Sequence, residues 1–343
     1  MDRKKALVVG IDNYPGQELH GAVNDARSVA QLFARHGDGA PNFDLELITA
    51  PLPNADGSTP QPEDPDMETS PKGGIAKSLL RDRIKALFEG DSEIALFYFS
   101  GHGSLASVGG TLITTEVRAC EDGLEMNDVL TWANNSAARE KVIILDCCHS
   151  GAFGASNSNI KVCEISEGMV VLTAALPSQQ AMESNSVGHG VFTELLAEAL
   201  NGAAADLLGQ VTPGAVYHYV DQALGSWEQR PIFMTHVNSW TPLRNVPPGP
   251  GSPALPRETI RKIVSYFPDP EQEYKLSPQY EFTAPGSDPA KVVMFRDLQA
   301  FAAVDLVVPI GEDHLYWAAI NSKSCKLTPF GKRYWRLVKH NRV

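Results

Sequence analysis

The sequence lacks the features of a membrane protein and of a disulfide-stabilised protein. No apolar run approaches the roughly 18 residues of a membrane-spanning helix. There are only five cysteines, two of them adjacent and none in a Cys-x-x-Cys pair. This usage argues against a disulfide framework and against structural zinc. The first residues, Met1–Lys5, lead directly into an apolar strand pattern. We therefore expect a cytoplasmic protein that contacts no membrane.

Positive charge is also scarce. The chain carries 29 Lys and Arg against 41 Asp and Glu, a net charge of −12. The imbalance lies in the first 256 residues, which hold 16 basic and 31 acidic side chains, whereas residues from Arg257 onward hold 13 and 10. An acidic surface attracts basic segments and repels nucleic acid, so we expect no nucleic-acid partner. A solvated acidic surface with no binding role would explain the same excess of acidic residues.

The stretch around Cys148 has the pattern of a buried strand that ends in reactive side chains. Val142–Leu145 is a short, continuous apolar run rich in β-branched residues, as in strands covered on both faces of a parallel sheet. The run is followed by Asp146, Cys147, Cys148 and His149. In open α/β sheets, ligands bind just beyond the carboxyl ends of the strands. We therefore expect a functional site here, with one cysteine as candidate nucleophile.

A second apolar run with the same pattern supplies a histidine. Glu93–Phe99 leads into Ser100–Gly103, which reads Ser-Gly-His-Gly. Adjacent strands lie about 4.8 Å apart, so side chains at their carboxyl ends can meet. If the two runs are neighbouring strands, His102 lies beside Cys148. His149 is the poorer candidate base, because it directly follows the cysteine and its side chain points away from it.

A thiol beside an imidazole suits acyl transfer. The thiolate is the nucleophile, and a free cysteine with a pKa of about 8.5 is mostly protonated at neutral pH. An adjacent histidine takes the proton and later returns it to a leaving amine. We therefore predict Cys148 as nucleophile and His102 as general base and acid. The backbone N–H groups of Gly103 and Cys148 are predicted to hold the developing oxyanion.

Other assignments stay open at this point. Cys147 is the rival nucleophile, although strand alternation directs it to the side opposite Cys148. His189, which lies between two glycines before an expected helix, is an alternative base. A metal site built from His102, Cys148 and His149 is a further alternative. Adjacent cysteines chelate poorly compared with Cys-x-x-Cys, so we expect no metal there.

Four short motifs occur in order along the chain. They are Gly10–Tyr14 (Gly-Ile-Asp-Asn-Tyr), Leu19–Ala26 (Leu-His-Gly-Ala-Val-Asn-Asp-Ala), Ser100–Gly103 (Ser-Gly-His-Gly) and Asp146–Gly151 (Asp-Cys-Cys-His-Ser-Gly). Together they resemble the caspase-like peptidases, specifically the metacaspase and prokaryotic caspase branch, over about Lys4 to Trp240. The resemblance implies a cysteine endopeptidase in which the cysteine directly before His-Ser-Gly, here Cys148, carries catalysis.

The resemblance also implies a fold, and the proline content and local patterns of the remaining chain indicate the domain organisation. The expected fold is α/β and caspase-like, with a mostly parallel six-stranded sheet flanked by helices. We assign residues 1–243 to a caspase-like peptidase domain and residues 244–256 to a proline-rich linker. Residues 257–343 are expected to form a small C-terminal α+β module that resembles a winged helix.

Local patterns predict a helix cap, an irregular loop and a strand. We expect a helix that begins with Asn24 or Asp25 as its N-cap. Ala50–Gly74 contains six prolines and is expected to be a long irregular loop. In the C-terminal module, Tyr316–Ile320 is expected to be a strand.

The motif around the nucleophile departs from the animal caspase form, Gln-Ala-Cys-[Arg/Gln/Gly]-Gly with a histidine about 50 residues upstream. Here His102 precedes Cys148 by 46 residues, and Asp146 replaces the glutamine. The arginines with which animal caspases select aspartate are not visible. In metacaspase-like members, the positions matching Asp25, Ser100 and Asp146 line the pocket for the residue before the scissile bond. Two carboxylates suit a guanidinium or an ammonium group, so we predict cleavage after Arg or Lys. For Asp25, the alternative is a helix-capping role without substrate.

Metacaspases often need calcium, bound by a set of aspartates. Asp122 and Asp128 lie in roughly the corresponding region, but a paired-Asp stretch is missing. The residues after the expected nucleophile offer no carboxylate either. We therefore expect no cofactor, with calcium as the alternative.

Caspase-like zymogens are often cut between their large and small halves. The corresponding segment here is Ala152–Gly168, and Lys161 is the only Lys or Arg between Lys141 and Arg230. We therefore predict autocleavage after Lys161, with an ordinary surface lysine as the alternative. Bacterial proteins of this kind are often latent effectors of stress or antiviral defence, switched on by another protease or by a signalling protein. The resemblance implies such a role and such partners, together with protein substrates that expose Arg or Lys.

A function of another class is a catalytically idle caspase-fold scaffold that recruits partners through its C-terminal module. The last 21 residues hold seven basic side chains and no acidic one, which suits phosphates or an acidic protein surface. With a net charge of only +3 from Arg257 onward, we favour protein docking over DNA binding.

Overall fold

The computed structural model describes residues 3–106, 109–116, 123–147, 165–174, 190–224, 231–238, 240–247 and 254–343. The chain divides into two compact units. The first comprises Met1–Ala205 and Gln210–Val246, and the second comprises Asp206–Gly209 and Pro247–Val343.

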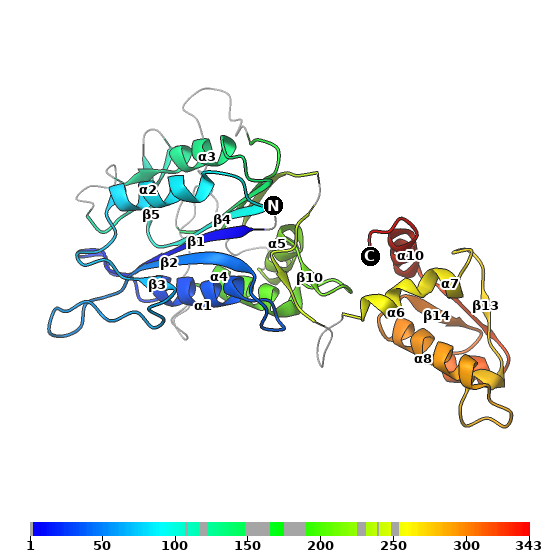
Figure 1. The fold of residues 1–343 in the computed structure, drawn as a ribbon. Coiled ribbons are helices and arrows are strands. Elements are labelled where there is room, and N and C mark those ends of the chain that lie inside the picture. The colour runs from blue at the N-terminus through cyan, green and yellow to red at the C-terminus, as the bar shows by residue number, and fades with distance from the viewer. Residues whose placement is uncertain are drawn as a thin grey trace. The chain divides into compact units, whose positions relative to one another are not determined.

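A seven-stranded sheet forms the centre of the first unit (Figure 1). Its strands, in the order β11-β9-β8-β4-β1-β2-β3, are β11 (Ile232–His236), β9 (Met169–Thr173), β8 (Glu140–Asp146), β4 (Ile94–Ser100), β1 (Lys4–Ile11), β2 (Phe43–Ala50) and β3 (Glu68–Thr69). All neighbours pair in parallel except β11, which pairs antiparallel to β9 at one edge. The expected α/β fold with a mostly parallel sheet is confirmed.

The sheet has one strand more than the six that we expected. The additional strand is β3, a pair of residues within the segment Ala50–Gly74 that was expected to be irregular throughout. Its Glu68 is buried at 3% exposure, so a short piece of this proline-rich segment is anchored to the sheet edge. The prediction for this segment was therefore wrong at β3.

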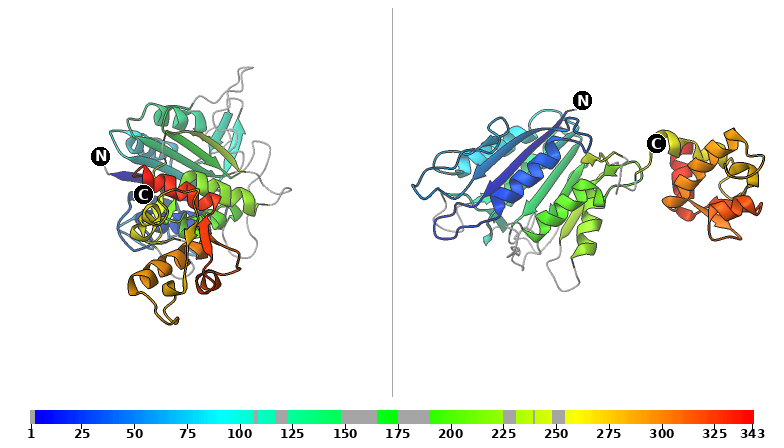
Figure 2. Two further views of the ribbon diagram at one scale, coloured as in Figure 1. Left: turned by 90° about the vertical axis from the view of Figure 1, so that its right-hand side faces the viewer. Right: turned by 90° about the horizontal axis from the view of Figure 1, so that it is seen from below.

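Both faces of the sheet are covered by helices, which explains the continuous apolar runs of its central strands. Every residue of β4 and of β8 is buried. One face packs against α2 (Lys77–Phe88) and α3 (Met126–Asn134). The other packs against α1 (Ala22–Ala34), α4 (Val191–Glu198) and α5 (Pro213–Ala223), with a π-helical turn, η2 (Ala199–Ala203), directly after α4. Figures 1 and 2 show these two helical layers with the sheet between them.

Two small antiparallel sheets complete the first unit. One consists of β5 (Gly103–Ala106), β6 (Gly109–Leu112) and β7 (Leu124–Glu125) and directly follows β4. The other pairs β10 (Gln210–Val211) with β12 (Arg244–Asn245). Residues 244 and 245, which we placed at the start of the linker, therefore belong to a strand of the first unit.

The second unit has its own apolar core and a three-stranded antiparallel sheet in the order β13-β15-β14. Its elements are α6 (Arg257–Arg261), α7 (Ile263–Tyr266), β13 (Tyr274–Lys275), η3 (Pro278–Tyr280), α8 (Pro289–Ala303), β14 (Val307–Ile310), α9 (Leu315–Ile320), β15 (Ser324–Leu327) and α10 (Pro329–Lys339). The prediction of a strand at Tyr316–Ile320 was wrong, because these residues form α9. Here Ala318 and Ala319 are completely buried, and the strand follows only at β15.

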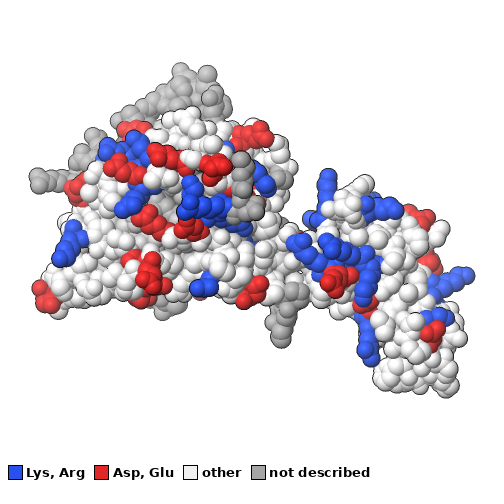
Figure 3. Space-filling view, viewed as in Figure 1, with Lys and Arg blue, Asp and Glu red and all other residues white. Residues whose placement is uncertain are grey.

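Most basic side chains near the C-terminal end of the second unit form no ion pair with a described acidic residue. Among the seven Lys and Arg of the last 21 residues, only Lys332 forms an ion pair within the described part of the chain, with Glu271. Figure 3 shows Lys and Arg side chains spread over the visible face of this unit. No helix in the described ranges is both long and apolar enough to span a membrane.

Candidate active site

The carboxyl ends of the central strands place two predicted pocket residues side by side. In the register of the sheet, Gly10 on β1 is opposite Ser100 on β4, and Ser100 is opposite Asp146 on β8. Opposed residues of adjacent strands point to the same face. Ser100 and Asp146 therefore share the face that α1 and α4 cover. Both are buried, at 3% and 7% exposure.

Gly10 allows helix α1 to approach this edge closely. A Cβ atom at Gly10 would lie 2.6 Å from the Ala22 carbonyl oxygen and 2.6 Å from the Ala26 Cβ, so no larger residue fits. The first turn of α1 therefore packs directly onto the strand ends. This packing brings Asp25 to Ser100, whose hydroxyl donates to Asp25 Oδ2 at 3.4 Å.

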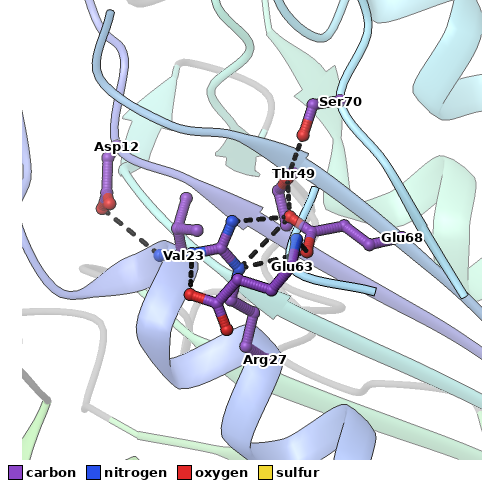
Figure 4. A network of polar contacts seen from close by, with 7 residues as sticks. All are labelled: Asp12, Val23, Arg27, Thr49, Glu63, Glu68 and Ser70. Carbon is purple, nitrogen blue, oxygen red and sulfur yellow. Dashed lines mark hydrogen bonds and ion pairs between the residues drawn. The ribbon is translucent and has the colours of Figure 1, made fainter. Parts of the chain in front are cut away.

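Asp25 does not cap its own helix, so the prediction that Asn24 or Asp25 forms the N-cap was wrong. Helix α1 begins at Ala22, and Asp12, at the end of β1, accepts the N–H groups of Ala22 at 2.9 Å and Val23 at 3.3 Å. Figure 4 shows Asp12 beside Val23 at the start of the helix. Because Asp12 satisfies these N–H groups, the carboxylate of Asp25 has no capping role and lies buried at the sheet edge.

Two hydroxyl groups orient the Asp146 carboxylate. The Thr193 hydroxyl on α4 donates to Asp146 Oδ2 at 2.5 Å, and the Tyr98 hydroxyl lies 2.6 Å from the Thr193 oxygen. Burial raises the pKa of Tyr98 well above its ordinary value, so Tyr98 stays protonated and donates to Thr193. Burial also raises the pKa of Asp146 to about 7. The nearby Asp25 adds to this rise, and the Thr193 bond opposes it.

Gly190 lies between the two carboxylates, just before α4. Its N–H group is 3.1 Å from Asp25 Oδ2. A Cβ atom at Gly190 would lie 3.1 Å from Asp146 Oδ2 and 3.2 Å from Asp25 Oδ2. Both carboxylates therefore converge on Gly190, where a larger residue would be crowded. We call Asp25, Ser100, Asp146, Gly190 and Thr193 the carboxylate side of the site.

His102 lies two residues beyond Ser100 and is held by a backbone carbonyl. Its Nε2 is 2.8 Å from the Gln17 oxygen. A carbonyl oxygen can only accept, so Nε2 carries the hydrogen in the neutral imidazole and Nδ1 keeps the lone pair. Nδ1 is therefore the nitrogen that can take a proton. The Tyr14 ring packs against the imidazole with ring centroids 4.5 Å apart.

The backbone after His102 directs the N–H group of Gly103 away from the neighbouring strand. Gly103 is opposite Leu112, and the Ile113 N–H donates to the His102 carbonyl at 3.0 Å. This pattern makes Gly103 and Leu112 a non-hydrogen-bonded pair, in which the N–H groups point away from the partner strand. The predicted oxyanion donor therefore does not bond to β6.

Cys147 is buried in the apolar core on the face of α2 and α3, at 1% exposure. Tyr14 belongs to the same cluster. We call His102, Tyr14, Gln17 and Cys147 the histidine side of the site. The predicted nucleophile Cys148 lies outside the described residues, as do His149, Lys161, His189 and Asp122.

A network of ion pairs and hydrogen bonds joins α1 to β3 (Figure 4). Arg27, two residues after Asp25 on α1, donates to Glu68 at 2.8 Å and to Glu63 at 2.8 Å. Glu68 also accepts from the Thr49 hydroxyl at 2.6 Å. Burial alone would raise the pKa of Glu68, but the bonds from Arg27 and Thr49 outweigh it and lower that pKa. The network neutralises Arg27 and ties β3 to α1.

Within the described ranges, no three His, Cys, Asp or Glu side chains cluster as metal ligands do. Asp128, which we weighed as a calcium ligand, is exposed on α3. Asp122, the other candidate ligand, lies outside the described residues.

Sequence reasoning missed Thr193, Tyr98, Gly190, Tyr14 and Gln17. Gly190 and Thr193 lie more than 40 residues beyond Asp146 and reach it only through the packing of α4. The one signal for them was the Gly-Val-Phe-Thr start of an amphipathic helix.

Comparison with known proteins is consistent with these observations. The family model described as "Caspase domain" matches residues 3–238. Metacaspase-9 of Arabidopsis thaliana is 24% identical over 210 residues, which is 56% of this chain and 60% of that protein. The crystal structure of caspase-1 from Spodoptera frugiperda covers 71% of this chain and 90% of its own, with 10% identity and a TM-score of 0.48. A structure from Geobacter sulfurreducens covers 69% of this chain and 94% of its own, with 12% identity and a TM-score of 0.46.

Proposed function

Because this chain belongs to the caspase family, we propose that it is a cysteine endopeptidase that cleaves protein substrates after Arg or Lys. Family membership supports the peptidase activity. The convergence of Asp25 and Asp146 on Gly190 carries the proposed specificity, because two buried carboxylates favour a cationic side chain.

The proposed mechanism uses a Cys-His dyad. His102 Nδ1 takes the proton of the Cys148 thiol, and the thiolate sulfur attacks the scissile carbonyl carbon. The carbonyl π electrons move to oxygen, where the N–H groups of Gly103 and Cys148 stabilise the negative charge. Collapse of the intermediate breaks the C–N bond, and the imidazolium protonates the leaving amine. Water then hydrolyses the thioester, with His102 as base. The bond from His102 Nε2–H to Gln17 supports this assignment, because it leaves Nδ1 as acceptor.

The proposed specificity follows from the charge of the pocket. An Arg or Lys side chain would replace the repulsion between Asp25 and Asp146 by attraction, while Ser100 offers a further oxygen. Because Asp146 is oriented by Thr193 and Tyr98, its position does not depend on the substrate. An aspartate in the same pocket would add a third carboxylate. We therefore expect Asp substrates to be rejected.

A peptide panel tests the activity and the nucleophile together. Fluorogenic peptides that end in Arg, Lys or Asp are incubated with the wild-type chain and with Cys148→Ala and Cys147→Ala, with and without calcium. We expect turnover of Arg and Lys peptides that needs Cys148, survives loss of Cys147 and does not depend on calcium. Turnover of Asp peptides alone would overturn the pocket assignment. Equal turnover by Cys148→Ala would exclude Cys148 as nucleophile.

We further propose that the chain is made latent and activated by cleavage after Lys161, as an effector in bacterial stress or antiviral defence. Support comes from the sequence, in which Lys161 is the only Lys or Arg between Lys141 and Arg230. Intact-mass analysis should show two fragments for the wild type and one chain for Lys161→Ala. Identical fragments from both proteins would exclude this site.

A scaffold function is the second candidate, favoured by the surface of the C-terminal unit. Arg333 and Arg336 on α10 are exposed, and among the described residues neither has an acidic partner. Trp317 on α9 is also 49% exposed. These groups suit docking of an acidic protein surface. No turnover of any peptide after limited proteolysis, together with salt-sensitive partner binding, would favour the scaffold over the peptidase.

A further inference from the structure

The loop between β1 and α1 contains a tight turn that holds His102 from two directions. The Gln17 N–H donates to the Tyr14 carbonyl at 3.0 Å and closes a four-residue turn. Pro15 is the second residue of this turn and Gly16, with φ of 77°, is the third. This is the arrangement of a type II turn, which needs a positive φ at its third position. The last residue of the turn, Gln17, holds His102 Nε2 through its carbonyl oxygen.

Tyr14, the first residue of the turn, contacts both the side chain and the backbone of His102. Its ring lies against the imidazole, with centroids 4.5 Å apart and planes inclined by 50°. Its hydroxyl accepts the His102 N–H at 2.9 Å and donates to the Ile113 carbonyl at 3.2 Å. Ile113 in turn donates to the His102 carbonyl. Both polar groups of the His102 backbone are therefore fixed by Tyr14 and by the residue that Tyr14 holds.

Gly101 is shaped to admit the Tyr14 hydroxyl. A Cβ atom at Gly101 would lie 2.4 Å from the Tyr14 oxygen, which is closer than any real contact. Because Gly101 has no Cβ atom, the Tyr14 hydroxyl can lie directly against it. Burial also raises the pKa of Tyr14 well above its ordinary value, although the bond from the His102 N–H opposes the rise. The hydroxyl thus stays protonated and keeps its bond to Ile113.

We propose that Tyr14 is a positioning residue for catalysis, which sets the orientation of the His102 imidazole and of the backbone that carries the Gly103 N–H. This inference rests on the proposed peptidase function. Tyr14 touches no reacting atom in this proposal and acts only through His102 and Gly103. Its loss should therefore lower kcat and disturb the thiol–imidazole pair, while substrate binding on the carboxylate side stays intact.

The variants separate the hydroxyl from the ring. Tyr14→Phe removes only the hydroxyl, and Tyr14→Leu removes the ring contact as well. Tyr334→Phe is the matched control, because Tyr334 is also a buried tyrosine whose hydroxyl accepts a backbone N–H, that of Leu207 at 3.3 Å in the C-terminal unit. All proteins are full-length and are compared by thermal unfolding before assay.

Two readouts report positioning rather than stability. The first is kcat and KM on an Arg peptide. We expect kcat to fall about 10-fold in Tyr14→Phe and about 100-fold in Tyr14→Leu, with KM within about twofold. The second is the pH dependence of alkylation by iodoacetamide, followed by mass spectrometry of the peptide that contains Cys148. In the wild type, alkylation should extend well below the pKa of about 8.5 of a free thiol. In Tyr14→Leu, the profile should move toward that of a free thiol.

Each outcome bears on the proposal. A lower kcat and a shifted alkylation profile in the Tyr14 variants, with neither change in Tyr334→Phe, support the proposal. Wild-type kcat and alkylation in both Tyr14 variants overturn it, as does a loss of activity that only follows a lower unfolding temperature with an unchanged alkylation profile. An equal shift in Tyr334→Phe overturns it too. If the wild type shows no turnover and alkylates like a free thiol, the proposed function itself fails and this inference with it. That result is distinct, because it appears without any substitution.

Discussion

The two sides of the site are built from the same strand ends but have opposite chemical character. The carboxylate side, under α1 and α4, holds two buried acids, two hydroxyls and the closely packed Gly190. The histidine side, which adjoins the core under α2 and α3, holds an imidazole, a buried tyrosine and a buried thiol. Alternation along a strand separates them, since Asp146 faces one side and Cys147 the other.

This separation has a consequence for function. A carboxylate bonded to the imidazole would stabilise its protonated form and would couple the two sides of the site. In the observed arrangement, His102 is bonded to a neutral carbonyl, and the acids face another layer of the protein. Substitutions on the histidine side should therefore change kcat, whereas substitutions on the carboxylate side should change KM and selectivity.

The largest effect is expected from His102→Ala. Loss of the general base should lower kcat on an Arg peptide by about 10³-fold or more, with KM nearly unchanged. His218→Ala is the matched control, because His218 is exposed on α5 and should keep wild-type kinetics. Steady-state kinetics measure both. A large rise in KM in His102→Ala would show that the two sides are not separable.

Asp146→Asn tests the carboxylate side. The substitution preserves the shape and the oxygen that accepts from Thr193 but removes one negative charge. We expect kcat/KM for Arg peptides to fall about 10²-fold, mainly through KM, and the preference for Arg over uncharged peptides to fall equally. Asp128→Asn, an exposed acid on α3, is the charge-matched control. A fall confined to kcat would assign Asp146 to the chemistry instead.

The main strands, with His102 just beyond the end of β4, were predictable, whereas the contacts that hold these residues were not. Continuous apolar runs identified β4 and β8, because a strand covered on both faces needs no polar alternation. The convergence of Asp25, Ser100 and Asp146 was anticipated only through a family resemblance. No local pattern connects residues that lie 75 positions apart.

The incorrect predictions for the cap of α1, for β3 and for α9 have a common physical cause. The cap of α1 comes from Asp12, ten residues away, and local capping rules consider only neighbouring residues. Strand β3 exists because Glu68 bonds to Arg27 and Thr49, against the irregular character of its proline-rich segment. Helix α9 has an aromatic, strand-like composition, and burial of Ala318 and Ala319 decides its form. In each case, a tertiary contact overrides the local sequence.

Arg27→Met tests how far the ion-pair network between α1 and β3 stabilises the fold. The side chain of Glu68 is only 1% exposed, so loss of Arg27 leaves a buried carboxylate without its cation. We expect the free energy of unfolding to fall by about 3 kcal/mol, or about 10²-fold in the unfolding equilibrium. Urea denaturation at pH 7 measures it, and Arg27→Met combined with Glu68→Gln should recover part of the loss.

The pKa shift of Glu68 adds a pH dependence to this comparison. The pKa of Glu68 is lowered in the folded chain, so its contribution to stability is present above its unfolded pKa of about 4.3. That contribution is lost as the pH falls through the lower folded value. The difference in the free energy of unfolding between wild type and Arg27→Met should therefore become smaller at acid pH. A constant difference down to pH 2 would contradict the ion-pair interpretation.

Gly190→Ala adds a methyl group beside both carboxylates without removing charge. The φ of Gly190 is −71°, so alanine introduces no backbone strain. Its methyl group would lie 3.1 to 3.2 Å from the nearest oxygens of both carboxylates and would crowd the cationic side chain that we propose to bind there. We expect KM for Arg peptides to rise about 10-fold with kcat unchanged. Gly214→Ala on α5, whose Cβ would make an ordinary 3.4 Å contact with Trp240, is the control.

The smallest effect is a pH dependence of KM on the carboxylate side alone. With a pKa raised to about 7 by burial and by Asp25, Asp146 is ionised above that pH and protonated below it. A cationic substrate favours the ionised form, so KM for Arg peptides should rise about fourfold from pH 8 to pH 6.5. In the folded chain without substrate, the same raised pKa lowers stability as the pH rises from about 4 to 7, because the unfolded chain releases this proton first. In Asp146→Asn, both KM and stability should depend less on pH. A pH-dependent KM that persists in this variant would assign the titrating group to another residue.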